Sequence, residues 1–435
     1  MSIHDRPAEL LKTLIRFNTV HPPNNELACI QYIDGLLQAA GVETTILARD
    51  DNRPNLIARL PGSGDAPPLL LQGHVDVVPV TGQQWTHPPF DAVEADGYIW
   101  GRGTLDMKGG VTMMLCAFLK MKAEGIVPKG DIILCILSDE ESDSKYGAKW
   151  LVENHADQFE GVKYALGEFG GATTYIAGTP FYPIQMAEKL SCRFKLTVQG
   201  PGGHGSLPFR GGAMARMGKL MAKLDKQRTP IHITPVVRMM LEGMADATKA
   251  PVSNVLRLLL NPRLTDLLSL RVPGLGVMRP MFRNTVSATI VRGGDTINVI
   301  PSQVELHLDG RMLPGFTPEQ FEAELRPIVG KDVQIERLEY DPPNLNPPDP
   351  KQFDMLATII KELDPAGVAI PMMMPAITDG RFFARLGIQT YGFIPIKLPK
   401  GFNFSAAIHA ADERIPVGAV EFGTAAIFRA LQRYE

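Results

Sequence analysis

The chain has 435 residues, and at roughly 150 residues per domain this length predicts two or three domains, or one large domain with an insertion. Lys and Arg number 44 against 47 Asp and Glu, so the net charge is −3, which argues against a nucleic-acid binder or a protein held at an anionic membrane. Hydrophobic residues make up 45% of the chain and charged residues 21%, values typical of a folded globular protein that exclude disorder.

The cysteines and the N-terminal residues carry no targeting or cross-linking signal. The four cysteines, Cys29, Cys116, Cys135 and Cys192, form no CxxC pair, so we expect buried thiols and neither a disulfide framework nor a thiolate zinc site. The first residues lack the apolar core of a signal peptide, and no uncharged apolar run reaches about 18 residues. We therefore expect a cytoplasmic protein without a membrane span.

The first third of the chain alternates helices with apolar strands. Helical spacing of apolar residues covers 8–17 and 25–40, with Pro22-Pro23-Asn24 between them, and a further helix is expected over 108–124. Strands are expected over 42–47, 55–60, 68–73 and 131–137. This alternation predicts an α/β fold with helices around a mixed, mostly parallel sheet.

The pattern changes near residue 190. Residues 191–198 and 303–308 alternate polar with apolar side chains, as strands with one solvated face do, and a helix is expected over 212–225. The Leu- and Met-rich stretch 236–281 predicts core or subunit-interface helices, although 252–270 is apolar enough to raise a membrane-surface alternative. We expect an inserted α+β domain at 191–341, and the Pro-rich run 341–348 as the linker back.

The first candidate for chemistry follows the strand that ends at Gly73. His74 and Asp76 lie just past the carboxyl end of this strand, where open α/β sheets usually bind ligands. Side chains two residues apart on an extended backbone share a face, so Asp76 can orient the imidazole of His74, as carboxylates do for metal-bound histidines. Taken alone, the pair is weak evidence, because such a pair is more often an ordinary surface feature than a metal site.

Further acidic residues and a second histidine occupy similar positions. Asp106 lies in a Gly-rich turn that matches no phosphate-loop pattern, and it is either a helix N-cap or a ligand. Asp139, Glu140 and Glu141 follow the apolar strand 132–137, where adjacent carboxylates repel one another unless a cation or solvent screens them. The remaining two candidates, each after a short apolar run, are Glu168 and His409; taken alone, His409 is more often a solvated or capping histidine than a ligand.

Together these residues supply two imidazoles and several carboxylates. Such a ligand set suits Zn²⁺, and also Co²⁺ or Mn²⁺. With one bridging carboxylate it suits two ions about 3.5 Å apart.

The motifs in series resemble the M20 family of dinuclear zinc metallopeptidases, which includes glutamate carboxypeptidase, aminoacylase-1, acetylornithine deacetylase, succinyl-diaminopimelate desuccinylase and carboxypeptidase S. The matching segments are 73–79, 101–109, 138–142, 167–168 and 408–416, in order over almost the whole chain. The resemblance implies a zinc-exopeptidase-like catalytic domain formed by 1–190 and 342–435. It also implies that 191–341 is an inserted lid and dimerisation domain.

The resemblance assigns a role to each candidate. It implies that Asp106 bridges two zinc ions, with His74 and Glu168 completing one site and Glu141 and His409 the other. Glu140 is then the general base that activates a water bridging the two metals, and Asp76 orients His74.

The inserted segment also resembles the family. Residues 200–208 are similar to its GHGSxP segment, whose histidine, His204 here, reaches the partner subunit's active site and polarises the scissile carbonyl; a plain turn histidine is the alternative. Residues 298–301 and 309–315 imply that Asn298 and Arg311 bind the substrate, with the Arg311 guanidinium able to grip a carboxylate in a bidentate fork unless it forms a rim salt bridge. A homodimer through the inserted domain follows.

The sequence departs from the family's usual pattern in two places, Glu168 and residues 375–381. Glu168 stands where many relatives have Asp, which favours the aminoacylase and carboxypeptidase branches, and 228–283 looks like the enlarged lid of the carboxypeptidase S group. Residues 375–381 lack the glycine-rich lead of the family's GGTSD segment.

The expected activity is metal-dependent hydrolysis of an amide next to a free carboxylate, on a small peptide or N-acyl amino acid. A carboxypeptidase and an N-acyl-amino-acid deacylase fit equally. The alternatives are a dipeptidase, an acetylornithine- or succinyl-diaminopimelate-type deacylase, a dinuclear phosphoesterase and a non-catalytic binding scaffold of the same fold.

Overall fold

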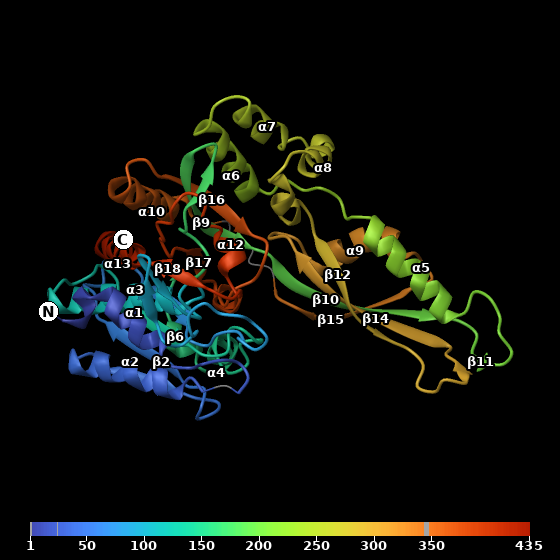
Figure 1. The fold of residues 1–435 in the computed structure, drawn as a ribbon, viewed down its shortest axis with the longest axis horizontal. Helices are drawn as coiled ribbons and strands as arrows, with labels where there is room; N and C mark the ends of the chain where they lie inside the picture. Colours follow the sequence, from blue (N-terminus) through green and yellow to red (C-terminus); the bar gives the residue numbers. More distant parts are fainter. Residues whose placement is uncertain (1, 24, 343–347) are drawn as a thin grey trace.

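A mixed β-sheet forms the centre of the larger part of the molecule (Figure 1). The computed structural model describes residues 2–23, 25–342 and 348–435. The strand order is β1 (Thr44–Leu47), β2 (Asn55–Leu60), β6 (Ile132–Leu137), β3 (Leu69–His74), β7 (Tyr164–Gly167), β17 (Gln389–Gly392), β9 (Thr179–Glu188) and β16 (Val368–Met374), with β8 (Thr174–Ile176) paired to β9. Strands β6, β3, β7 and β17 are parallel, so their carboxyl ends meet at one edge.

Both faces of this sheet are covered, which explains why its strands are continuous apolar runs. In β6 the side chains alternate, with Ile132, Leu134 and Ile136 in one core and Ile133, Cys135 and Leu137 in another. The first core also includes α1 (Pro7–Ile15), α2 (Leu27–Ala39), α3 (Lys108–Ala123) and α13 (Val417–Arg433), and the second includes α4 (Ala148–Asn154) and α11 (Gly380–Phe383). The layered α/β expectation is confirmed.

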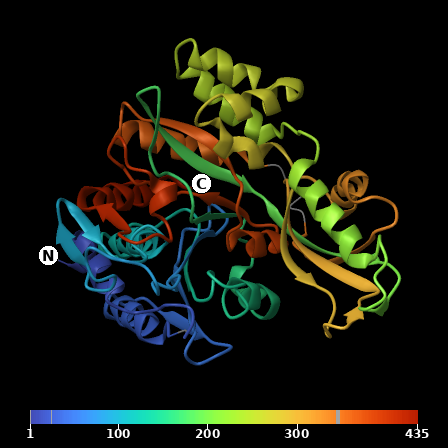
Figure 2. The same ribbon diagram turned by 45° about the vertical axis from the view of Figure 1, so that its right-hand side comes forward.

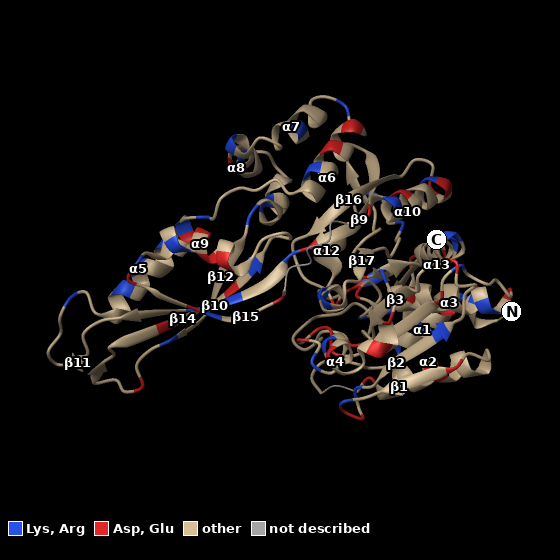
Figure 3. Ribbon diagram, turned by 180° about the vertical axis from the view of Figure 1, so that it is seen from behind, with Lys and Arg blue, Asp and Glu red and all other residues tan. Residues whose placement is uncertain are grey.

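A second, antiparallel sheet extends from the first. Its order is β12 (Thr285–Arg292), β14 (Gln303–Met312), β10 (Leu190–Gln199) and β15 (Gln334–Tyr340). Helices α5 (Ala213–Lys226) and α9 (Pro318–Val329) share a small core with one face. Along β14 every second residue is buried, which confirms the predicted strand with one solvated face, although this strand runs four residues further than 303–308. Lys and Arg are interspersed with Asp and Glu along both parts of the chain (Figure 3).

The chain passes from the first sheet to the second near Ser191 and returns near Asp341, and Asp341 links these two crossings. Its amide donates a hydrogen bond to Ser191 O (2.9 Å), and its Oδ2 accepts one from Ser191 N (3.1 Å). Arg385 Nη2 donates to Oδ1 of the same carboxylate (3.2 Å). The outgoing and returning strands are therefore held side by side, while 343–347 of the predicted linker, like Asn24 of the predicted stop signal, lie outside the described residues.

The Leu- and Met-rich stretch forms α6 (Pro235–Asp246), α7 (Val252–Leu258), α8 (Pro262–Arg271) and η3 (Leu275–Phe282), which lie beyond β9 and β16 at the top of Figures 1 and 2. Val237, Met240 and Leu241 of α6 are buried in the main core, as expected for a core helix. Helix α8 instead buries the polar residues Thr265 and Ser269 and leaves Leu267 and Leu270 exposed. Among the described residues, no helix is both long and apolar enough to cross a membrane.

Smaller elements complete the fold. They are the sheet β18 (Arg414–Pro416), β5 (Tyr98–Trp100) and β4 (Val93–Ala95), the pair β11 (Gly203–His204) and β13 (Val299–Ile300), the helices α10 (Pro350–Leu363) and α12 (Phe404–Ala407), and the 3-10 turns η1 (Ile3–Asp5), η2 (Ala156–Phe159) and η4 (Ala384–Leu386). All four cysteines are buried and free of disulfides, as predicted. The predicted helices and strands of the first third are present within two residues of their expected bounds.

We predict that Gly392→Ala destabilises the protein by about 1–3 kcal/mol, the usual cost of overpacking. A Cβ at this position of β17 would collide with the carbonyl oxygens of Glu168 and Phe169. The free energy of unfolding in urea measures the effect. Gly418→Ala on α13, where the Cβ meets open space, is the matched control and should stay within about 0.5 kcal/mol of wild type. Equal stability of the two variants would contradict the prediction.

Candidate metal centre

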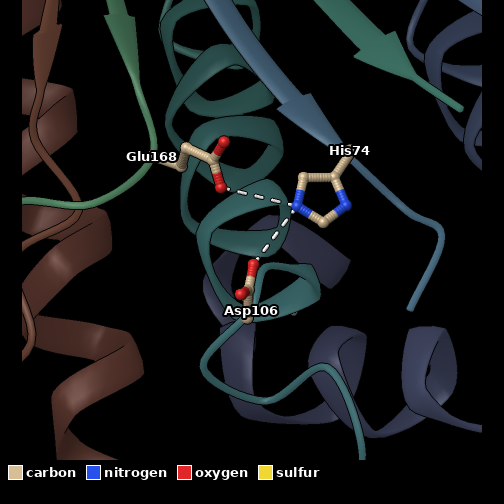
Figure 4. A group of neighbouring side chains, drawn as sticks. All are labelled: His74, Asp106 and Glu168. Carbon is tan, nitrogen blue, oxygen red and sulfur yellow. Dashed lines mark hydrogen bonds and ion pairs between the residues drawn. The ribbon is translucent and has the colours of Figure 1, made fainter. Parts of the chain in front are cut away.

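His74 is the last residue of β3, and its ring has carboxylates on both sides. Nε2 lies 3.2 Å from Asp106 Oδ1 and 3.5 Å from Glu168 Oε2 (Figure 4). Nδ1 lies 3.0 Å from the carbonyl oxygen of Asp76 and 3.3 Å from its Oδ1. Because Nδ1 is held by Asp76, the ring orientation is fixed and Nε2 is directed at the other two carboxylates.

Asp106 connects this group to a second one. It precedes Met107, the N-cap residue of α3, so the N-cap alternative for Asp106 is wrong. Its second oxygen, Oδ2, lies 3.1 Å from Nε2 of His409, which is in turn 3.3 Å from Oε1 of Glu141. One aspartate therefore contacts both histidines, one through each carboxylate oxygen.

The residues of the acidic turn after β6 have different partners. Asp139 is buried and pairs with Arg53 (2.7 Å), away from the histidines. The amides of Glu140 and Glu141 donate to Oδ1 and Oδ2 of Asp76, at 3.1 and 3.0 Å. The same carboxylate thus orients His74 and holds the backbone of the acidic turn against it.

Burial and charge shift the pKa values of these groups in opposite directions. Burial raises the pKa of Glu168 to about 7, with Asp106 adding to the rise. Burial also raises the pKa of Glu140, and the charge of Glu168 increases this shift. For Asp106 the effect of burial is outweighed by hydrogen bonds from His409 and His74, which lower its pKa. The carboxylate of Asp106, which accepts a hydrogen bond from Nε2, and the nearby carboxylate of Glu141 raise the pKa of His409 to about 10.

The side chains fit metal ions. Among the described residues, two groups of side chains could hold a metal ion: His74, Asp106 and Glu168, and Asp106, Glu141 and His409. Within each group the three ligand atoms lie within 4.8 Å of one another. Glu141 Oε1 and Glu168 Oε2 are buried and have only the ion-pair contacts with His409 and His74, without a hydrogen-bond partner. Three acidic side chains packed this closely repel one another unless cations lie between them. Imidazole and carboxylate ligands around a shared carboxylate suit two divalent ions.

Two of the predicted substrate residues, His204 and Asn298, lie apart from this cluster. His204 and Asn298 are exposed near the β11–β13 pair, at the far end of the molecule in Figure 1. The Nδ1 of His204 accepts a hydrogen bond from the amide of Ser206 (3.2 Å). Arg311 of β14 pairs with Asp309 (3.0 Å). Within one chain, the structure therefore brings together the five predicted ligands and Asp76, but not His204 or Asn298, whereas Arg311 lies opposite Ser191 at the start of β10.

Sequence reasoning assigned no role to several buried charges beside the cluster. Arg102 and Glu413 form a buried ion pair (2.6 Å), and Asp379 accepts a hydrogen bond from Ser144 (2.5 Å). Burial raises the pKa of Asp379 to about 6. The arginine between two glycines and the glutamate four residues after His409 are the signals that could have marked the ion pair.

Comparison with known proteins identifies relatives along nearly the whole chain. The model of peptidase family M20/M25/M40 matches residues 70–433. A probable carboxypeptidase S-like protein of Dictyostelium discoideum is 29% identical over 368 residues, covering 80% of this chain and 68% of its own. The N-fatty-acyl-amino acid synthase/hydrolase of Homo sapiens is 30% identical over 378 residues, covering 84% of this chain and 74% of its own.

The fold is also similar to solved structures. An M20 family metallo-carboxypeptidase from Sulfolobus solfataricus superimposes with a TM-score of 0.68 at 15% identity, and 99% of each chain is covered. At this identity the likeness concerns the fold alone.

We predict that two divalent ions bind per chain and that the ligands contribute unequally. His409→Ala should retain one ion, because the group of His74, Asp106 and Glu168 remains intact. Asp106→Ala should weaken both positions, because this side chain belongs to both groups. Metal content after loading with Zn²⁺ and gel filtration, measured by atomic emission, distinguishes the variants. The same metal content in both would refute the shared role of Asp106.

Proposed function

Because the chain belongs to peptidase family M20/M25/M40, a family of metal-dependent hydrolases acting on C–N bonds, we propose that it cleaves an amide next to a free carboxylate. The substrates are small peptides or N-acyl amino acids, and the reaction is that of a carboxypeptidase or a deacylase. The observation that supports this most is the pair of ligand groups sharing Asp106 beside the acidic turn. The complete set of candidate ligands gives no support to a non-catalytic scaffold.

The metals we propose are two Zn²⁺ ions, with Co²⁺ or Mn²⁺ as substitutes. His74 and Glu168 would hold one, Glu141 and His409 the other, and Asp106 both. Such ions supply Lewis acidity, which polarises the carbonyl and lowers the pKa of a water.

Glu140 is the residue to which we assign proton transfer. Its neighbour Glu141 belongs to a ligand group, and its amide is fixed by Asp76. A pKa raised by burial and by Glu168 suits a carboxylate that takes a proton from the attacking water and returns it to the leaving nitrogen.

A second subunit completes the site in this proposal. Residues 191–341 form the inserted lid, and a homodimer forms through it. Strand β12 is an edge strand, and around it and the β11–β13 pair exposed apolar side chains are concentrated, including Leu207, Ile290, Val291 and Ile297. Monomeric proteins rarely leave such edges open. These features support burial of the edge against a partner copy.

His204 would then act on the partner's substrate. Because its Nδ1 accepts the amide of Ser206, the neutral ring carries its proton on Nε2, which can donate to the carbonyl oxygen as negative charge develops there. Arg311 would grip the substrate carboxylate in a bidentate fork, with Asn298 as a further contact.

The test of the activity is a panel of N-acyl amino acids and dipeptides with free carboxylates, assayed by release of free amino acid with and without a chelator. We expect chelator-sensitive turnover, and we expect Glu140→Ala to retain the metal content yet lose at least about 10²-fold in kcat. Glu160→Ala, an exposed acidic residue, is the control and should leave kcat unchanged. Near wild-type turnover by Glu140→Ala would remove Glu140 from proton transfer.

The role of His204 is tested by mixing subunits. We expect His204→Ala to lower kcat far more than it raises KM. Refolding an equal mixture of Glu140→Ala and His204→Ala chains should restore about a quarter of wild-type activity, because each mixed dimer then has one complete site. No recovery in a mixture shown to contain mixed dimers would mean that His204 does not act across subunits.

A further inference from the structure

A buried ion pair joins the two loops that bring Asp106 and His409 together. Arg102 lies in the turn before α3, and Glu413 lies directly before β18; their side chains are 1% and 0% exposed. Arg102 Nη1 is 2.6 Å from Glu413 Oε2. Burying two charges is costly, and such a pair is weak evidence for a role in stability alone.

On one side of the pair, Glu413 holds the backbone around Asp106. Its Oε1 accepts hydrogen bonds from the amides of Leu105 (2.7 Å) and Asp106 (3.3 Å). The amide of Gly101 in turn donates to the carbonyl of Glu413 (2.9 Å). Consequently the position of the Asp106 carboxylate depends on the loop after His409.

On the other side, Arg102 and Gln83 hold the backbone of His409. Arg102 donates to the carbonyls of His409 (3.2 Å) and Ala410 (3.1 Å). Gln83 Nε2 donates to the same His409 carbonyl (2.8 Å), and its Oε1 accepts from Arg102 Nη2 (2.8 Å). His409 has a φ of +62°, a conformation that residues with a side chain adopt only when their surroundings impose it.

We propose that Arg102, Glu413 and Gln83 are positioning residues that fix His409 relative to Asp106 and thereby set the metal affinity of the position formed by Asp106, Glu141 and His409. The inference rests on the proposed metal pair. The three residues do not contact the metal in this proposal. They hold the carbonyls of His409 and Ala410 and the amides of Leu105 and Asp106. The position formed by His74, Asp106 and Glu168 depends on β3 and β7. Its metal affinity therefore changes less when only the contacts to His409 are weakened.

The direct test titrates the metal-free full-length chain with Zn²⁺ by calorimetry, with Co²⁺ absorption as a second reading. Gln83→Ala removes a donor to the His409 carbonyl from a half-buried residue outside the core. Arg102→Lys keeps the charge opposite Glu413 but loses the fork that reaches four acceptors, the carbonyls of His409 and Ala410 among them. We expect both to weaken one binding step by about 10–100-fold, as supporting residues of metal ligands typically do, and to leave the other step within a few-fold. His409→Ala identifies which step belongs to its position.

Two comparisons keep the test specific. Arg283→Lys alters another buried arginine, paired with Asp266 in the inserted segment, and should change neither step. The melting temperature of metal-free Gln83→Ala should equal that of wild type. Unchanged binding in Gln83→Ala and Arg102→Lys, or equal weakening of both steps, would overturn the inference. A wild-type chain that binds no metal would instead refute the proposed function.

Discussion

The site depends on one constraint, the burial of Asp106 between two histidines. Each of its oxygens faces the Nε2 atom of one imidazole, at 3.2 and 3.1 Å, and Glu168 and Glu141 approach the same two nitrogen atoms, at 3.5 and 3.3 Å. A buried carboxylate is tolerated only with compensating positive charge, and here two further carboxylates increase the demand. Hydrogen bonds from the two imidazoles meet part of it, which lowers the pKa of Asp106, while buried oxygens of Glu141 and Glu168 have no hydrogen-bond partner. The fold therefore maintains a deficit of positive charge at one point.

Parallel strands explain how that point is assembled. His74 ends β3, the acidic turn follows β6 and Glu168 follows β7, and these three strands are neighbours in parallel. Their carboxyl ends meet at one edge, so the pairing of the strands brings side chains that are distant in sequence next to one another. Asp76 then links the first two strand ends by hydrogen-bonding the amides of Glu140 and Glu141. Because the strands are buried on both faces, the position of these ends is fixed by the core.

The arrangement of the site also shows which of its residues a sequence can reveal and which it cannot. His74 and Glu168 were predictable because an apolar strand immediately precedes each, and the layered fold follows from the alternation of helices and strands. His409 lacks that signal: it follows the short helix α12, not a strand, and has a positive φ. The neighbouring glycines and the spacing from His409 could mark Arg102 and Glu413 in the sequence, but not their hydrogen bonds to backbone groups, because every residue has such groups. Helix α6 was expected to be buried, but sequence could not show that it packs beside β16, because nothing in its pattern specifies the partner face.

The separation of the ligand cluster from His204 has a consequence for the proposed chemistry. The cluster lies on the layered sheet, whereas His204 and Asn298 lie at the far end of the second sheet, and Arg311 is paired with Asp309. A group that stabilises a transition state must come within about 3 Å of the developing charge. In the proposed dimer, a partner copy supplies that group, and the exposed edge of β12 together with the apolar side chains near β11 gives the partner a surface to bind. Metal binding and carbonyl polarisation would then belong to two different parts of the fold, so their alignment depends on the crossing at Asp341 and on the subunit interface more than on either part alone.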